Sequence, residues 1–378
     1  MHLQAWRREH KQQIVMAHTS RSAYQVICFV VLAVSAALAA CGGGAEGDSS
    51  AQPAAPGAPT YNPPTASGYN LAAKLAAMPA EFRGISAPVP PATTSRRTVT
   101  TAAELAAALG VSGTQIDVAP GRHVLEMVSR ATDQIINCAP GATIAPTGST
   151  ALTLSAARRI EVRGCRLEGG VYVLGASDIK FYDVTLVSKD TGSIADSVEF
   201  GGSTRVLIEH STFTTPRYVA YSSDCVDFIV ANSQMHSVAG LSARQSSIRF
   251  VNTRRGVVLD SRITNPTHHN LRAHAGSSLI YWSGNQLEGG GLYAADNPVG
   301  ALNVSGIWAT DNRIYHTATN LFSFYSPPEV LGAILIGNRG YSGNGGAASM
   351  DPGGTDPTWI VRENVREPYR APPVWSML

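Results

Sequence analysis

The stretch IEVRGCRL, residues 160–167, is the first of eight similar segments that decide the fold. The others are IKFYDVTL (179–186), VLIEHSTF (206–213), FIVANSQM (228–235), GVVLDSRI (256–263), IYWSGNQL (280–287), IWATDNRI (307–314) and ILIGNRGY (334–341). Successive segments begin 19 to 28 residues apart. One such unit cannot bury its apolar face alone, so the copies stack on one another. The sequence therefore predicts an all-β solenoid, a single-chain right-handed parallel β-helix with one coil per copy.

The segments on either side of the repeats predict how the solenoid begins and ends. Thr101 and Glu104 have the spacing of a capping box, which predicts a helix over residues 102–109. A helix at this place is expected to plug the open core of the first coil. We expect the β-helix domain to span residues 96–345. Residues 346–378 break the repeat and are expected to lie along the outside as a tail.

The first 95 residues are expected to consist of a targeting signal followed by a flexible tether. Basic residues precede an apolar run, 26–40, which is too short for a comfortable membrane span and ends in small residues. Leu-Ala-Ala-Cys at 38–41 resembles a bacterial lipoprotein box, which implies a signal peptide over 1–40 and a lipid on Cys41. An ordinary signal peptide with a chance Cys41 is the alternative, and Met16 is a second possible start. Residues 41–95 form a flexible tether with a helical patch at 70–78, expected to pack on an end of the solenoid.

Composition and cysteine spacing limit the partners. Charged residues make up 15% of the chain and the net charge is +2, without a basic cluster interleaved with aromatics, so no nucleic-acid partner is expected. Cys138 and Cys165 are 27 residues apart, close to one coil, so they are expected to stack either as a disulfide or as two core thiols. Cys225 has no evident partner. No metal-ligand spacing is visible, and a monomer is expected.

A second strand in each copy carries the candidate site. Counting back 14 residues from the bulky residue that closes a copy reaches a strand whose central side chain is flanked by inward apolar residues, as Glu199 is by Val198 and Phe200. Strand alternation turns such central residues outward on one sheet face. The sixth coil needs a shift of one residue. The predicted column is Tyr172, Glu199, Tyr221, Arg249, Arg272 with His274, Tyr293 and Tyr325.

Aromatic rings alternating with ionisable groups suit a long sugar polymer, and arginine binds uronate carboxylates through two parallel hydrogen bonds. β-Elimination or C5 epimerisation needs a cation for the carboxylate, a base and a second proton carrier. Arg249 or Arg272 could hold the carboxylate, His274 or His269 could be the base, and Tyr221 or Tyr293 could carry the other proton. The prediction is a lipid-anchored lyase or epimerase on an anionic polysaccharide, in the outer membrane or facing the periplasm of a Gram-negative bacterium.

Two other functions stay open. A non-catalytic protein that only binds polysaccharide would use the same face. A glycoside hydrolase needs two carboxylates about 5 to 9.5 Å apart, which Asp196 and Glu199 could supply. The alternative interpretation of the whole column is a solvent-exposed polar face without a binding function.

The phrase DSVEFGGSTRVLIEHSTF, residues 196–213, resembles a phrase of the pectate lyases, D-A-I-S-I-x-G-S-S-N-I-W-I-D-H-C-x-F. The chain is thus similar to the pectate-lyase-like superfamily of right-handed β-helices. The resemblance places Asp196, Glu209 and His210 on family positions, and the family's counterpart of Glu209 binds calcium. The next strand, 218–221, lacks the carboxylates that complete that ligand set. The resemblance therefore implies the fold and leaves calcium as a possible cofactor with an incomplete ligand pattern.

Overall fold

The computed structural model describes residues 68–188, 197–238, 246–266, 269–295, 303–316, 322–324, 330–342, 357–368 and 370–377. The chain divides into two compact units, Met1–Ala55 and Pro56–Leu378, and all described residues belong to the second. The expected signal peptide, Cys41, Asp196 and Tyr325 lie outside the described residues.

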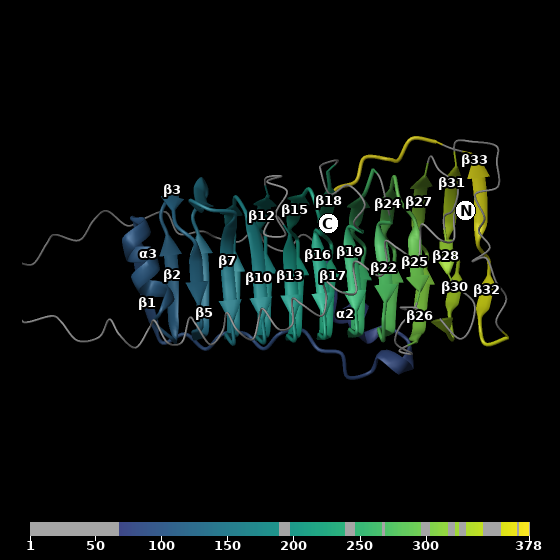
Figure 1. The fold of residues 1–378 in the computed structure, drawn as a ribbon, viewed down its shortest axis with the longest axis horizontal. Helices are drawn as coiled ribbons and strands as arrows, with labels where there is room; N and C mark the ends of the chain where they lie inside the picture. The colour runs from purple at the N-terminus through teal and green to yellow at the C-terminus, as the bar shows by residue number, and fades with distance from the viewer. Residues whose placement is uncertain are drawn as a thin grey trace, which may run out of the picture. The chain divides into compact units, whose positions relative to one another are not determined.

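Three parallel sheets, named A, B and C, run the length of the repeats (Figure 1). Sheet A contains β1 (Ser95–Val99), β2 (Thr114–Val118), β5 (Thr132–Cys138), β8 (Arg158–Arg163), β11 (Ser177–Tyr182), β14 (Thr204–Glu209), β17 (Val226–Ala231), β20 (Arg254–Leu259), β23 (Ser278–Ser283), β26 (Val304–Thr310), β29 (Val330–Leu331), β30 (Ile334–Ile336) and β32 (Ile360–Arg362). Sheet B contains β3 (Gly121–Val124), β6 (Ala142–Ala145), β9 (Arg166–Leu167), β12 (Thr185–Val187), β15 (Thr212–Thr215), β18 (Gln234–Ser237), β21 (Arg262–Thr264), β24 (Gln286–Glu288), β27 (Arg313–His316), β31 (Arg339–Ser342) and β33 (Val365–Pro368). Sheet C contains β4 (Met127–Ser129), β7 (Thr150–Ser155), β10 (Gly170–Leu174), β13 (Val198–Gly201), β16 (Ala220–Ser223), β19 (Ile248–Val251), β22 (Leu271–His274), β25 (Leu292–Ala295) and β28 (Phe322–Phe324).

Each coil visits the three sheets in turn, and each strand pairs with the equivalent strand of the next coil. The first residues of the predicted copies lie opposite one another, for example Ile160 with Ile179 and Val206 with Phe228. Their side chains and those two positions on fill one continuous core, in which Phe200 and Phe228 meet edge to face with ring centres 4.8 Å apart. The predicted all-β parallel solenoid is confirmed.

The last copy is displaced by one residue from the sequence prediction. Ile334 lies opposite Trp308, not Ile307, so that Ala333 and Leu335 point into the core. A buried ladder of amides sets this register: Asn285 and Asn312 each donate a backbone N–H to the side-chain oxygen of the next ladder member, Asn312 and Asn338. The register of the last coil therefore follows the positions of the asparagines and not those of the isoleucines.

The C-terminal segment is only in part the expected tail. β32 and β33 continue sheets A and B, so the coil repeat extends into residues 357–368. Residues beyond them do lie along the outside: Arg370 donates to the Tyr341 hydroxyl at 2.6 Å, and Gln286 donates to the Pro373 carbonyl at 3.1 Å.

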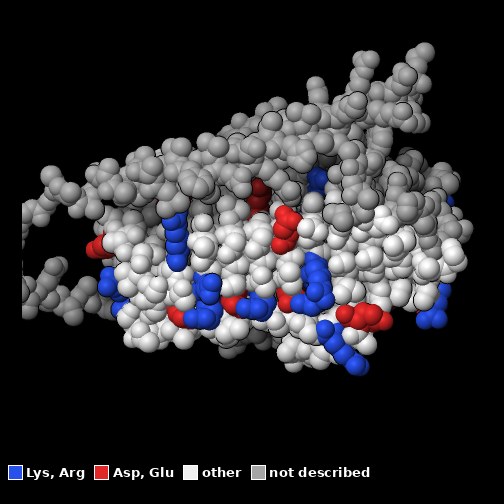
Figure 2. Space-filling view, turned by 60° about the horizontal axis from the view of Figure 1, so that its bottom comes forward, with Lys and Arg blue, Asp and Glu red and all other residues white. Residues whose placement is uncertain are grey.

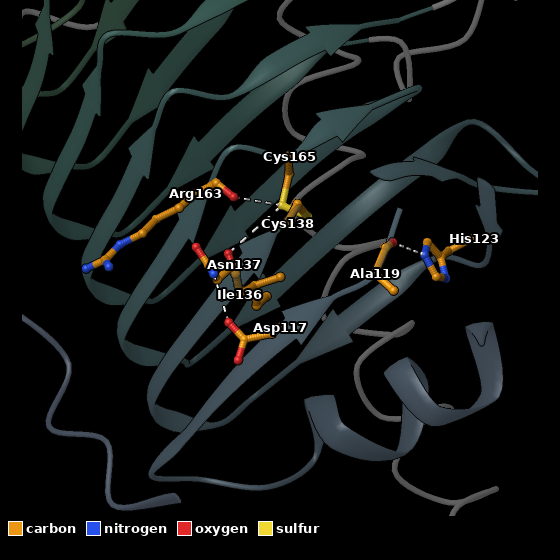
Figure 3. The surroundings of a disulfide bond; sticks show 8 residues. All are labelled: Asp117, Ala119, His123, Ile136, Asn137, Cys138, Arg163 and Cys165. Carbon is orange, nitrogen blue, oxygen red and sulfur yellow. Dashed lines mark hydrogen bonds between the residues drawn. A yellow bond between two sulfur atoms is a disulfide. The ribbon is translucent and has the colours of Figure 1, made fainter. Parts of the chain in front are cut away.

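Helix α3 (Ala102–Leu109) covers the N-terminal end of the core, as the capping-box pattern predicts (Figure 1). The Thr101 hydroxyl accepts from the Glu104 N–H, and the Glu104 carboxylate accepts from the Thr101 N–H. Leu105 and Leu109 are buried in the core of the solenoid. Below them, Cys138 and Cys165 form a disulfide between neighbouring coils with Cα atoms 4.9 Å apart (Figure 3). Cys225 is buried and free.

The sequence predicted that the helical patch before β1 packs on an end of the solenoid, and this prediction is wrong. Helix α2 (Leu71–Ala76) and the short 3-10 helix η1 (Ala80–Phe82) lie on the outward side of sheet A (Figure 1). Phe82 is buried there, with its ring 5.3 Å from those of Tyr281 and Trp308. The correction has a physical reason: part of the outward side of β14, β17 and β20 is apolar and needs a cover, namely Leu207, Ile229, Ala231, Val257 and Leu259. We call residues 69–94 the strap.

The rest of the strap follows a ladder of alternating charges on sheet A. Asp133, Asp178 and Asp227 alternate with Arg159, Arg205 and Arg255, one residue per coil, and each arginine binds the aspartate before it. Figure 2 shows red and blue side chains alternating in such a row. The N–H groups of Val89 and Ala92 donate to Asp178 and Asp133, two coils apart, at 2.9 Å. Three residues of extended Pro-rich chain span about 9.3 Å and two coils about 9.6 Å, so the spacings agree.

In the described part of the chain, none of the helices is long and apolar enough to cross a membrane.

Candidate functional site

Sheet C brings the predicted column together. In successive strands, Tyr172 lies opposite Glu199, Glu199 opposite Tyr221, and Tyr221 opposite Arg249. Arg249 lies opposite Arg272, and Arg272 opposite Tyr293. The residues that flank Glu199 and Arg249 in their strands are buried in the core: Val198, Phe200, Ile248 and Phe250. The shift of one residue predicted for the sixth coil is present, because Leu271 pairs with Ile248.

Arg249 is held by two tyrosines. Its Nη1 donates to the hydroxyl of Tyr218 at 2.7 Å. Its guanidinium carbon is 5.8 Å from the ring centre of Tyr218 and 5.7 Å from that of Tyr221. These contacts are cation–π interactions, and the two rings pack against each other with centres 4.8 Å apart. The guanidinium is therefore fixed in orientation.

The opposed arginines give the column its electrostatic character. Arg249 and Arg272 occupy directly opposite positions in adjacent strands, which are about 4.8 Å apart. Like charges directly opposite each other are unfavourable, and a bound carboxylate between two guanidinium groups turns the repulsion into attraction. This pair favours an anionic ligand.

Glu199 is the strongest candidate for proton transfer. Burial raises the pKa of its carboxyl to about 7, while the positive charge of Arg217 lowers it by a smaller amount. A carboxyl with a pKa near neutrality can both accept and donate a proton at neutral pH. Burial also raises the pKa of Tyr221, with the charge of Arg249 opposing, so Tyr221 is neutral and keeps its proton.

The two histidines stand at different places. His274 ends β22, two residues after Arg272, and thus lies on the same outward side. His269 precedes the strand, in the turn, and its carbonyl accepts from the Ser247 N–H at 3.1 Å. The strand position favours His274 over His269 as a member of the column. Tyr293 pairs with Ser323 at the far end, and Asp196 and Tyr325 fall outside the described residues.

Two residues of the site were missed by the sequence reasoning. Arg217 and Tyr218 lie in the turn between β15 and β16, outside the alternating strand that placed the others. The signal that could have found them is the side-chain chemistry of this turn, where arginine and tyrosine directly precede the strand that carries Tyr221.

Of the residues that match the pectate-lyase phrase, Glu209 and His210 do not join this face. Glu209 ends β14 on sheet A and forms an ion pair with Lys180 at 3.0 Å. His210 follows it and stacks on Tyr182, with ring centres 5.9 Å apart. Among the described residues, no group of three or more His, Cys, Asp or Glu side chains is placed to hold a metal ion. A calcium site thus stays a prediction, with Asp196 outside the described residues.

No protein-family model matches the sequence, and no curated protein matches it. Among solved structures, the chain is similar to an alginate lyase from Paenibacillus, with 15% identity, a TM-score of 0.38, and coverage of 73% of this chain and 97% of that one. A pectate lyase from Xanthomonas campestris gives 13% identity, a TM-score of 0.31, and coverage of 73% and 84%. A surface adhesin of Streptococcus pneumoniae gives 11% identity, a TM-score of 0.32, and coverage of 64% and 80%. Likeness at this level says nothing about reaction or ligand, and it is the sheet pairings of the chain itself that make it a parallel β-helix.

Proposed function

We propose that the outward face of sheet C binds an anionic, uronate-containing polysaccharide, and that the protein is a lyase or C5 epimerase of that polymer. The observation that carries the proposal is the opposed pair Arg249 and Arg272, set in one column with tyrosines and a carboxyl whose pKa is near 7. A column in register over several coils suits a chain of sugars better than a small ligand.

The residues divide the chemistry as follows. Arg249 and Arg272 hold the carboxylate and so make the proton on the adjacent C5 more acidic. His274 or Glu199 takes that proton as base. In a lyase the C4–O bond then breaks, its electrons stay on the leaving oxygen, and Tyr221 protonates that oxygen. In an epimerase no bond to C4 breaks, and C5 receives a proton from the opposite face.

The test is made in D2O with the purified protein and three polymers: alginate, pectate and chondroitin sulfate. Elimination gives ultraviolet absorbance from an unsaturated uronate, and epimerisation gives deuterium at C5 without that absorbance, read by NMR. Arg249→Lys keeps the charge but loses the two-pronged hydrogen bond, so activity should fall about tenfold or more. Arg166→Lys on sheet B is the matched control and should behave like wild type. Absence of both signals on all three polymers would contradict a catalytic role.

Polysaccharide binding without catalysis is a second candidate, favoured by the fixing of Arg249 against two tyrosine rings, which suits recognition by itself. Calorimetric binding of one of the three polymers, with no product and no exchange, would establish it. No observation favours the hydrolase alternative, because Asp196, the partner that Glu199 would need, lies outside the described residues.

We also propose that Cys41 carries a lipid that anchors the protein to a bacterial membrane, with the solenoid outside the cytoplasm. The support is the box Leu-Ala-Ala-Cys at 38–41 after an apolar run. Mass spectrometry of the mature N-terminus should find an acylated Cys41, and the Cys41→Ser variant should leave the membrane fraction. An unmodified N-terminus at another residue would refute this proposal.

A further inference from the structure

The turn of residues 216–218 is hydrogen-bonded to the coil before it and to the coil after it. The Tyr218 carbonyl accepts from the N–H of Val198, the residue before Glu199, at 3.1 Å. The hydroxyl of Ser237, on the neighbouring coil, donates to the Arg217 carbonyl at 3.4 Å. The turn is thus bonded to the coils on both sides, and its side chains project from a fixed backbone.

Tyr218 acts on the anion-binding side. Its hydroxyl accepts from Arg249 Nη1, and its ring lies against both Tyr221 and the guanidinium. A guanidinium has five N–H donors in one plane, so a single short bond together with ring contacts sets the direction in which the others point. The orientation of Arg249 therefore depends on a residue from a turn, not on its own strand.

Arg217 lies on the side of Glu199, because the carbonyl of the next residue, Tyr218, accepts from the N–H of Val198, which directly precedes Glu199. The positive charge of Arg217 favours the ionised form of Glu199 and opposes the effect of burial on that carboxyl. Without this charge, burial alone would hold Glu199 further towards its neutral form. One turn thus contacts the arginine and influences the carboxyl, which stand two coils apart in the column.

We propose that residues 216–218 are the positioning element of the sheet C face: Tyr218 orients Arg249 towards the carboxylate of a uronate, and Arg217 keeps Glu199 able to accept a proton. The inference rests on the proposed function of that face. Neither residue needs to touch the polymer, so both are positioning residues. An oriented arginine together with a carboxyl able to accept a proton suits one class of substrate, in which a carboxylate lies next to a transferable proton.

Two variants test the two halves in the full-length protein. For Tyr218→Phe, the affinity for a galacturonate or mannuronate oligomer, measured by calorimetry, should fall roughly tenfold because a hydrogen bond to a charged group is lost. Tyr281→Phe, on sheet A, removes a hydroxyl of the same kind and should bind as wild type does. For Arg217→Gln, NMR titration of labelled glutamate carboxyls should show the Glu199 pKa rising above its wild-type value, whereas Arg166→Gln should leave it unchanged.

The outcomes separate this inference from the proposed function. If wild type binds no uronate oligomer, the proposed function fails, while the Glu199 titration still decides the role of Arg217. If wild type binds and Tyr218→Phe binds equally well, the role given to Tyr218 is wrong. An unchanged Glu199 titration in Arg217→Gln would refute the second half. Circular dichroism of each variant confirms that the solenoid is intact, and Arg217→Lys should restore the wild-type titration.

Discussion

At the scale of single residues, the burial of Glu199 carries a cost in stability. Its pKa of about 7 lies above the ordinary value of 4.5, because the protein shields the carboxyl from water. The folded state therefore prefers the neutral carboxyl. Stability from this preference is fully present below pH 4.5 and is lost as the pH rises through about 7, where folding must bury a charge.

Replacing Glu199 with Gln should therefore stabilise the protein above pH 7 and have little effect near pH 4. The gain is expected to be about 2 kcal/mol, the size of a shift of this order after allowance for partial exposure. Urea unfolding at pH 4 and pH 8 measures it. Glu168→Gln removes a carboxylate that Arg122 binds at 2.6 Å and should give no gain at either pH. Equal stability of Glu199→Gln and wild type at pH 8 would show that burying the ionised carboxyl costs no stability and that its pKa is not raised.

Strand alternation and the count of residues along the repeat together predicted Tyr172, Glu199, Tyr221, Arg249 and Arg272 in one column, because a parallel coil repeats its outward positions. The sequence could not predict that Arg217 and Tyr218 reach the same place. A turn has no period from which a side-chain direction could be deduced.

At the scale of elements, two devices hold the coils in register: the amide ladder inside and the strap outside. Asn285, Asn312 and Asn338 stack in one ladder, which Ser211, Ser233 and Ser261 continue. Asn232 lies one position away from this ladder, at a residue of positive φ. The place of the strap was not predictable, because Leu71 and Phe82 would suit any apolar surface.

The ladder makes Asn312 a sensitive position. Its Nδ2 donates to the Trp282 carbonyl at 2.9 Å and to Asn338, and its side-chain oxygen accepts from Asn285. Asn312→Ala would leave these buried groups without partners, and we expect a loss of about 2 to 4 kcal/mol in urea unfolding. Asn364→Ala, at the partly exposed end of the same ladder, should lose clearly less, since water can replace the amide there. Equal losses would contradict the role of burial.

The strap should be required for a stable sheet A. Phe82→Ala removes the ring packed on Tyr281 and Trp308, and the expected loss is about 3 to 5 kcal/mol. Val89→Ala, also in the strap but 51% exposed, should stay within about 0.5 kcal/mol of wild type. Thermal unfolding of wild type, Phe82→Ala and Val89→Ala measures both losses. Equal stability of Phe82→Ala and wild type would show that the strap does not contribute to the stability of sheet A.

At the scale of the whole molecule, the solenoid is a row of units that contact only their neighbours, with differently built ends. α3 and the disulfide close the N-terminal end. In the described part of the last coil, Ile360, Val361 and Val365 are 43 to 47% exposed. The sequence predicted the eight repeat segments. It did not place β2 and β32 in the repeat, because terminal repeats depart from the common pattern.

Hydrogen exchange should therefore be graded along the axis. Amides of β5 and β8 are expected to exchange more slowly than those of β30 and β32, read by mass spectrometry of peptides. Reducing the disulfide should speed exchange in β5 and β8 while leaving β30 and β32 as before. Exchange at one common rate would mean that the protein opens all at once and that its ends are equivalent.

The strap also determines how the protein would respond to a mechanical load. A pull on the chain before residue 68 arrives first at α2, where Lys74 holds Asp260 at 3.0 Å and Leu71 is buried against sheet A. It can reach β1 only after those contacts and the bonds of Val89 and Ala92 have been broken one by one. A force between this segment and the solenoid would therefore be spread over the flank of several coils, and the edge strand β1 would be protected from peeling.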